Sequence, residues 1–249
     1  MNDIHTQQQD QIRRLLAAQT RLGRWRLQAM LTVRRWAWMT VVNGARITKR
    51  TLDLVIALVA LLISAPLFVV IAVLVRIDGG PVFFRQTRIG FMGREFGMLK
   101  FRSMCVNAEA KLAELLAQNE KAQGITFKMK NDPRVTKVGR FIRRASIDEL
   151  PQLINVLKGD MSIVGPRPPL PREVALYSVE DRKRLFAIPG ITCLWQVGER
   201  NGGRFEIGDR NRIDFDEQVN LDVRYIESQS AWGDLWIMLK TVPAMLLGK

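Results

Sequence analysis

The most hydrophobic part of the chain is residues 52–75, where 24 consecutive positions hold one charged side chain, Asp53. About 20 apolar residues in a row allow a helix to cross the hydrocarbon core of a bilayer. The first element that the pattern predicts is therefore a membrane helix. A buried helix of a soluble domain is the alternative interpretation.

Pro66 lies in the middle of this segment, where its ring removes a backbone donor and clashes with the preceding helical turn. Ser64 is placed to donate its hydroxyl to a freed carbonyl and to widen the bend. Basic residues stand on both sides of the segment, whereas a helix that crosses once has its basic excess on one side. These features favour a kinked helix that enters one leaflet and returns, and a spanning helix stays open as the alternative.

After residue 78 the pattern becomes that of a water-exposed domain. GGPVFFRQTRIG predicts a turn, a short strand and a second turn, and EFGMLKFRSM predicts another strand. Periodic apolar positions predict helices over residues 105–123, from Ser146 to just before Gly159, over 171–187 and over 214–228. The C-terminal stretch from Trp232 predicts an apolar helix too short to span, which either packs in the core or lies at a membrane interface.

The predicted fold class is α/β, as a helix-rich α+β arrangement. It consists of a kinked re-entrant membrane helix, amphipathic interfacial helices and one small domain in water. The predicted domains are a basic leader over residues 1–46, the membrane helix over 47–76 and the water-exposed domain over 77–249.

The leader is unusually basic. Residues 1–50 hold ten basic and two acidic residues, and thus eight of the fourteen net positive charges of the 249-residue chain. Trp25, Trp36 and Trp38 lie among its arginines. Such a segment is either solvated and disordered or a basic helix on anionic lipid headgroups. A transit peptide is a third interpretation, and a secretory signal is excluded because no uninterrupted apolar core follows the first charges. The leader is also a candidate contact in a homodimer.

The net charge of +14 predicts a polyanionic partner, which is nucleic acid, an anionic membrane or a phosphorylated ligand. The chain has one histidine, His5, and two cysteines, Cys105 and Cys193. This excludes a zinc site of several histidine or cysteine ligands and an ordinary Ser-His-Asp triad. Both cysteines are interpreted as packed thiols. If the chain is an enzyme, carboxylates, lysines and arginines must perform the chemistry.

The segment RRASIDELPQL concentrates the candidate chemistry, with Asp148 and Glu149 side by side. Ser146 followed by Glu149 forms the pattern of a capping box, in which case the two carboxylates only complement a helix N-terminus. The alternative is an active site, because Arg143 and the later Arg167 add positive charge. Adjacent carboxylates among guanidinium groups suit a nucleophile and a Mg²⁺ ligand for phosphoryl transfer.

Several blocks in a fixed order resemble the bacterial sugar transferase family, the monotopic phosphoglycosyl transferases of glycoconjugate and exopolysaccharide synthesis. The resemblance covers residues 47–248, and the Asp-Glu block that runs into GDMSIVGPRP is its most specific part. The blocks are Lys49 and Arg50 with Asp53, GGPVFFRQTRIG, KFRSM, SIDELPQLINVLKGDMSIVGPRP, PGIT-x-x-WQV and LDVRYIES.

The resemblance implies an enzyme that transfers a sugar 1-phosphate from a UDP-sugar to polyprenol (undecaprenyl) phosphate and releases UMP. This is the initiating step of exopolysaccharide or other glycoconjugate synthesis. The resemblance also implies that Asp148 is the nucleophile, that a phosphosugar-aspartyl intermediate gives ping-pong kinetics, and that Glu149 binds the catalytic Mg²⁺. Arg143 and Arg167 match basic residues near the phosphates.

Further residues follow from the same resemblance. Lys100 and Arg102 are candidates for the phosphate pocket or for contact with the lipid phosphate. Ser64 and Pro66 match the break of a re-entrant helix, although Ala65 separates them here. The implied location is the cytoplasmic face of the bacterial inner membrane, as a monotopic protein. The implied partners are UDP-sugar, polyprenol phosphate and anionic lipid, without nucleic acid.

Some features leave the substrate open. The Arg-rich stretch over residues 198–214 is either a nucleotide contact or a solvated loop. The PGIT-x-x-WQV region favours glucose or galactose as the sugar. A membrane-tethered nucleic-acid-binding protein is one rival function, but the sequence has no aromatic-glycine RNA motif, zinc finger or helix-turn-helix. An inactive scaffold homologue is another, and the intact Asp148 and Glu149 argue against it.

Overall fold

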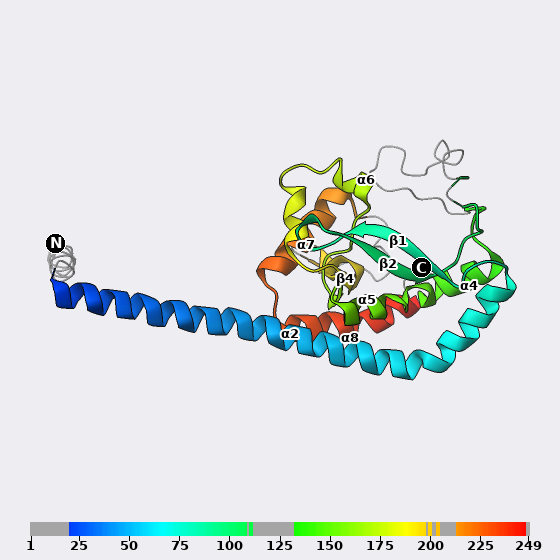
Figure 1. The fold of residues 1–249 in the computed structure, drawn as a ribbon. Helices are drawn as coiled ribbons and strands as arrows, with labels where there is room; N and C mark the ends of the chain where they lie inside the picture. Colours follow the sequence, from blue (N-terminus) through cyan, green and yellow to red (C-terminus); the bar gives the residue numbers. More distant parts are fainter. Residues whose placement is uncertain are drawn as a thin grey trace. The chain divides into compact units, whose positions relative to one another are not determined.

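The computed structural model describes residues 20–108, 110–111, 132–197, 199–200, 203–204 and 213–247 (Figure 1). The chain forms two compact units, Met1–Lys49 and Arg50–Lys249. The second unit contains the apolar core and all of the predicted site residues.

The helix α2 runs from Arg21 to Ile77 and includes part of the leader as well as the apolar segment. Within the described residues, Gly44–Ile77 is the one helical stretch that is long and apolar enough to cross a membrane. Its apolar side chains are mostly exposed, Ile63 to 76% and Leu62 to 67%. A helix in a soluble core would bury them, so the exposure is compatible with contact to lipid. The predicted limits of the leader and of the membrane helix stay predictions.

Figure 1 shows that α2 bends in its cyan part, which belongs to the second unit. Pro66 lies inside the helix and has no N–H for the carbonyl of Leu62. The Ser64 hydroxyl donates to the carbonyl of Ala60 at 2.6 Å. The serine therefore bonds the carbonyl one turn before itself and not the one that the proline leaves without a donor. A proline inside a helix and a serine hydroxyl that bonds a carbonyl of the preceding turn are both known causes of helix bending.

The segment after α2 forms the predicted antiparallel hairpin of β1 (Phe83–Ile89), η1 (Phe91–Gly93) and β2 (Glu95–Phe101). Phe83 pairs with Phe101 at its open end, and Ile89 pairs with Glu95 at its turn. The open end packs against the last turns of α2, where the ring centroids of Phe68 and Phe101 lie 4.8 Å apart. The hairpin turn is therefore the part of this sheet furthest from the end of α2.

The carboxylate segment lies in the series α4 (Lys137–Arg144), η3 (Ile147–Glu149) and α5 (Gln152–Lys158). The predicted helix ends as expected, because Gly159 has a φ of 93° and caps α5. The capping box at Ser146 is wrong. Ser146 has a φ of 53° and makes no side-chain cap hydrogen bond, whereas a capping serine needs an extended backbone. Asp148 and Glu149 therefore lie in the separate 3₁₀ turn η3.

Residues 171–187 form two short helices, α6 (Pro171–Val174) and η4 (Asp181–Phe186), so the prediction of one helix is wrong. The Ser178 N–H donates to Asp181 Oδ2 at 2.8 Å, and the Asp181 N–H donates to Ser178 Oγ at 3.2 Å. This reciprocal pair begins a new helical turn and interrupts the apolar period. The predicted helix over 105–123 lies mostly outside the described residues, and residues 106–108 form a turn.

The remaining elements are β3 (Ser162–Val164), β4 (Gly190–Thr192), η5 (Leu194–Val197), β5 (Glu199–Arg200), β6 (Gly203–Arg204), α7 (Phe215–Glu227) and α8 (Ala231–Leu247). The last two helices confirm the predictions for 214–228 and for the C-terminal stretch. The strands β3 and β4 are parallel. A Cβ on Gly190 would lie 2.1 Å from the backbone N of Gly165, so this close approach requires glycine.

The main core joins α2, α5, α7 and α8 through buried residues such as Ala57, Val156, Leu221 and Ile237. The other face of α8 is apolar but exposed, with Trp232 at 79%. Core packing of α8 is thus confirmed, and its seating at a membrane interface stays a prediction.

Two polar side chains attach α2 to this core. Arg50 donates from Nη1 to the Val156 carbonyl at 2.7 Å and from Nη2 to the Leu157 carbonyl at 3.1 Å, at the C-terminal end of α5. Asp53 is 6% exposed and accepts from the Ile163 N–H of β3 at 3.1 Å. The single charge of the apolar segment therefore has a structural partner in the domain.

We expect Asp53→Ala to lower the free energy of unfolding by about 1–3 kcal/mol, because it leaves the buried Ile163 N–H without its acceptor. Thermal unfolding in detergent micelles measures this as a lower Tm. Asp78→Ala removes an exposed carboxylate just after α2 and serves as the control. Equal Tm values for the two variants would contradict the anchoring role.

Candidate functional site

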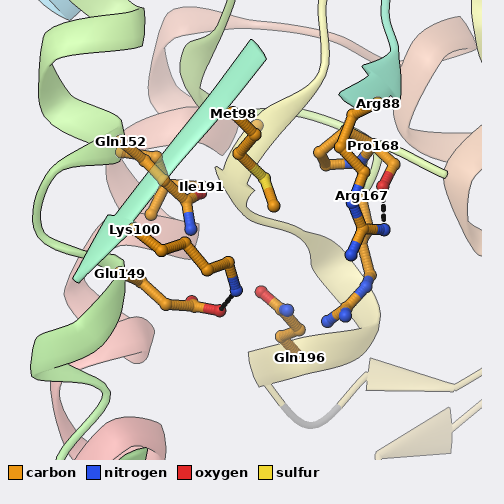
Figure 2. Close-up of a pocket in the computed structure, with 10 residues that line it drawn as sticks. Arg88, Met98, Lys100, Glu149, Gln152, Arg167, Pro168, Ile191 and Gln196 are labelled. Carbon is orange, nitrogen blue, oxygen red and sulfur yellow. Dashed lines mark hydrogen bonds and ion pairs between the residues drawn. The ribbon is translucent and has the colours of Figure 1, made fainter. Parts of the chain in front are cut away.

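A pocket in the second unit collects side chains from the hairpin and from the segments that follow it. Figure 2 shows Lys100 and Glu149 on one side of this pocket and Arg88 and Arg167 on the other. The complete lining consists of Arg88, Met98, Lys100, Glu149, Gln152, Arg167, Pro168, Gly190, Ile191 and Gln196.

On the first side, Lys100 Nζ donates to Glu149 Oε1 at 2.8 Å, and the two side chains are 18% and 31% exposed. The buried Asn155 places both residues. Its Nδ2 donates to the Gly97 carbonyl and its Oδ1 accepts from the Leu99 N–H, each at 2.9 Å. This amide holds β2 against α5, so that Lys100 faces the Glu149 carboxylate at the end of η3, just before α5.

Asp148 lies beside Glu149 but is not part of the lining, and it is only 7% exposed. Its pKa is raised to about 6, first because burial disfavours the charged carboxylate. The neighbouring Glu149 raises this pKa as well, whereas Lys100 and Arg143 lower it. Asp148 is therefore ionised at neutral pH, but it is a weakly solvated and more basic carboxylate than an exposed one.

On the opposite side, Arg88 is 6% exposed. Its Nη1 donates to the Pro168 carbonyl at 2.8 Å, and its Nε and Nη2 donate to Gln86 Oε1 at 3.1 and 2.8 Å. Burial and the like charge of Arg167 lower the pKa of Arg88 to about 10, so the guanidinium stays charged at neutral pH. Two positive groups thus share one wall of the pocket.

The other predicted site residues lie in three places. Arg143 is exposed and donates from Nε to Ser103 Oγ at 2.8 Å, close enough for its charge to act on Asp148. Arg102 does not line the pocket; it is buried and donates from Nη2 to the Val75 carbonyl of α2 at 2.8 Å. Ser64 and Pro66 lie in the bend of α2. The structure therefore brings together Lys100, Glu149 and Arg167, with Asp148 and Arg143 adjacent.

Sequence reasoning missed Arg88 and Gln196. They lie within RQTRIG and PGIT-x-x-WQV, where they were assigned only to a strand and to a family block. Gln152 belongs to RRASIDELPQL, the segment in which the sequence concentrates the candidate chemistry, but no role was assigned to it. Arg88 is the more consequential of the two missed residues, because its partner Pro168 is 80 residues away and no local pattern marks that contact.

The carboxylates fit Mg²⁺ only as part of a larger site. In the described ranges, no three His, Cys, Asp or Glu side chains lie together as a metal cage. Magnesium commonly takes one or two carboxylates together with phosphate oxygens and water. Glu149, which lines the pocket, can supply one carboxylate, and a phosphorylated substrate and water would have to supply the rest.

One further prediction falls mainly outside the described residues, and another concerns a described cysteine. Residues 198–214, interpreted as a nucleotide contact or a solvated loop, lie mainly outside the described residues. Within this stretch, the strands Glu199–Arg200 and Gly203–Arg204 form a short antiparallel pair. Cys193 is buried, and burial raises its pKa well above the ordinary value, as expected for a packed thiol.

A family model described as "Bacterial sugar transferase" matches residues 44–248. Galactosyl transferase CpsE of Streptococcus agalactiae serotype III is 48% identical over 202 residues, which cover 81% of this chain and 43% of that protein. The undecaprenyl-phosphate galactose phosphotransferase of Salmonella typhimurium is 43% identical over 207 residues, covering 82% of this chain and 41% of that protein. The chain thus spans about two fifths of the length of these relatives.

Other relatives are matched over more of their length. The UDP-glucose:undecaprenyl-phosphate glucose-1-phosphate transferase of Caulobacter vibrioides is 41% identical over 202 residues, covering 80% of this chain and 69% of that protein. The exopolysaccharide production protein ExoY of Sinorhizobium fredii is 41% identical over 207 residues, covering 82% of this chain and 87% of that protein.

The burial of Asp148 predicts a pH-dependent gain in stability for Asp148→Asn. Below the ordinary pKa of 3.8 the carboxyl is protonated in both the folded and the unfolded state, and above about 6 it is ionised in both, so the folded state then bears the full desolvation cost. The variant should therefore unfold at a higher Tm than the wild type at pH 8, with a gain of up to about 3 kcal/mol.

The gain should shrink steadily as the pH falls toward 4. Thermal unfolding at several pH values measures it, with the exposed Glu180→Gln as the control. A gain that is the same at pH 4 and pH 8 would contradict the burial of an ionised carboxylate at this position.

Proposed function

The chain belongs to the bacterial sugar transferase family, and we propose that it transfers a sugar 1-phosphate from a UDP-sugar to undecaprenyl phosphate, with release of UMP. Relatives named for transfer onto undecaprenyl phosphate and for exopolysaccharide production support this assignment. The names of these relatives also support a hexose, glucose or galactose, as the sugar. The reaction would start the synthesis of an exopolysaccharide or a related glycoconjugate.

One observation carries the proposal. A single pocket has the Glu149 carboxylate and Lys100 on one side and two guanidinium groups on the other, with the buried Asp148 adjacent. Guanidinium and ammonium groups bind phosphate oxygens. A carboxylate can attack a phosphorus atom once the negative charge of the phosphate oxygens is neutralised. The same unit contains the exposed apolar part of α2, as an enzyme with a lipid substrate requires.

In the first half-reaction, an oxygen of the Asp148 carboxylate forms a bond to the phosphorus that carries the sugar. The bond from this phosphorus to the bridging oxygen breaks, and its electron pair leaves with UMP. The raised pKa of Asp148 makes the ionised carboxylate a better nucleophile than an exposed one would be. Only 7% of Asp148 is exposed, so little of its surface is open to a substrate.

In the second half-reaction, a phosphate oxygen of undecaprenyl phosphate attacks the same phosphorus. The bond to the Asp148 oxygen breaks, which restores the carboxylate and leaves the sugar on a lipid diphosphate. Lys100 would neutralise phosphate oxygens in both steps, because it lines the pocket beside Glu149. No histidine is needed, since neither step requires a general base.

We assign Mg²⁺ binding to Glu149, with the phosphates of the donor completing the coordination. When bound, the ion would neutralise negative charge on the transferred phosphoryl group.

We place the protein on the cytoplasmic face of the bacterial inner membrane, with the apolar part of α2 entering one leaflet and returning at Pro66. The basic flanks of this segment support the assignment, since both ends would then lie in the cytoplasm. The arginines and tryptophans of the leader would rest on anionic headgroups. Undecaprenyl phosphate would present its phosphate at this same surface.

The proposed reaction predicts UMP release from UDP-glucose or UDP-galactose in detergent with Mg²⁺ and undecaprenyl phosphate. Asp148→Asn should give no release and no covalent phosphosugar adduct by mass spectrometry. Glu149→Gln should lose about 10²-fold in rate, as expected for removal of one charged stabilising group.

The wild-type rate should fall tenfold per pH unit below about pH 6, as Asp148 becomes protonated. Turnover that persists in Asp148→Asn would refute the assigned nucleophile.

The re-entrant topology predicts that both ends of the apolar segment face the cytoplasm. In a chain with Cys105 and Cys193 replaced by serine, Arg46→Cys and Asp78→Cys should be shielded from an impermeant thiol reagent added to intact cells. Both should react after permeabilisation. Asp78 is preferable to Gly80, where a Cβ would lie 2.0 Å from Arg102 Nη1. Reaction of only one cysteine from outside would establish a spanning helix instead.

A further inference from the structure

Arg88 is a buried cation whose hydrogen-bond partners are neutral. It is 6% exposed, and it donates only to the Pro168 carbonyl and to the amide oxygen of Gln86. None of the ion pairs formed among the described residues includes it. A buried charge is costly unless an opposite charge accompanies it. The carboxylates of Glu173 and Glu149 act on the charge of Arg88 without forming an ion pair with it. Arg88 therefore has no direct contact with an opposite charge among the described residues, and an anion bound in the pocket would supply one.

Arg167 adds a second guanidinium group to the same wall. Both side chains line the pocket, and Figure 2 shows them next to each other, opposite Lys100 and Glu149. Two like charges at one wall repel each other, and an oxyanion that contacts both groups removes this repulsion. A phosphate group suits such a pair best, because its oxygens match the forked geometry of guanidinium donors.

The hairpin register indicates which phosphate this is. Lys100 pairs with Phe84 near the open end, which packs against α2, whereas Arg88 pairs with Phe96 next to the turn. Arg88 lies five positions after Phe83 along β1, which corresponds to about 16 Å of strand. A lipid phosphate at the bilayer surface approaches from the α2 end of the hairpin. A phosphate near Arg88 therefore belongs to the substrate that arrives from water.

We propose that Arg88 and Arg167 together bind the phosphate of the leaving nucleotide, a nucleoside 5′-monophosphate. This inference rests on the proposed function and assigns a role to Arg88 that the function alone does not require. When the bond between the sugar-linked phosphorus and the bridging oxygen breaks, the electron pair remains on that oxygen, and the nucleotide phosphate gains negative charge. A pair of guanidinium groups at this phosphate stabilises the charge as it develops.

The competing explanation is that Arg88 only holds the Pro168 carbonyl in place. The substitution Gln86→Glu distinguishes this structural role from phosphate binding. It keeps the size of the side chain that contacts Arg88 and gives Arg88 a carboxylate partner. The structural contacts are retained, but the positive charge is neutralised. Asn220→Asp introduces the same charge change at an exposed position of α7 and is the matched control.

We expect Gln86→Glu to weaken UMP binding at least tenfold by titration calorimetry in detergent, and to raise the inhibition constant of UMP in the transfer assay equally. The Tm should stay equal to that of the wild type or rise. Asn220→Asp should change none of these values. Unchanged UMP binding in Gln86→Glu would overturn the proposal and leave Arg88 with its structural role.

Two other outcomes are informative. One distinguishes binding of the nucleotide phosphate from binding of the lipid phosphate, and the other distinguishes failure of this inference from failure of the proposed function. A raised KM for undecaprenyl phosphate with unchanged UMP inhibition would also overturn the inference, because it assigns Arg88 to the lipid phosphate. If the wild type binds UMP, Gln86→Glu binds it more weakly and no transfer occurs with any UDP-sugar, then the phosphate site stands and the proposed function fails.

Discussion

The side-chain amide of Asn155 determines the geometry of the pocket. It is 1% exposed and bonds the Gly97 carbonyl, the Leu99 N–H and Asp160 Oδ2. A buried amide that is satisfied on both sides allows one arrangement of the elements it joins, because any shift leaves polar groups unpaired. The strand β2 therefore lies in one register against α5. Lys100 follows directly after Leu99 and so faces the acidic turn, while the paired strand β1 carries its arginine toward the opposite wall.

Charges of opposite sign are thus fixed on elements that cannot move independently. The burial that raises the pKa of Asp148 also lowers the pKa of Arg88, and neither group has a direct ion pair among the interactions that the structure records for the described residues. Opposite charges act on both without direct pairing: Lys100 and Arg143 lower the pKa of Asp148, and Glu173 and Glu149 raise that of Arg88. In the proposed reaction, a diphosphate with its metal ion would supply both kinds of charge at once.

Local signals predicted much of the fold, and long-range contacts account for what they missed. Alternating residues predicted the hairpin, and Gly159 predicted the end of α5, because strand alternation and a left-handed cap depend on neighbouring residues. The capping box predicted at Ser146 was wrong, because a serine three residues before a glutamate also occurs with the serine in a left-handed turn. At residues 171–187 the periodic apolar positions predicted one helix, but the Ser178 cap begins a second, separate helical turn. In the pocket, family blocks supplied Glu149 and Arg167, but Arg88 depends on a carbonyl 80 residues away, which no sequence window contains.

The attachment of α2 at both of its apolar ends has a consequence for handling the protein. Arg50 and Asp53 hold one end to α5 and β3, and Arg102 holds the Val75 carbonyl at the other. The same helix supplies Ala57 to one apolar core and Ile71 to the other. A fragment that begins after Ile77 would lose these contacts together and would be no independent water-soluble domain. The pocket and its helix share these contacts, so a detergent that covers α2 poorly is expected to unfold the domain that holds the pocket.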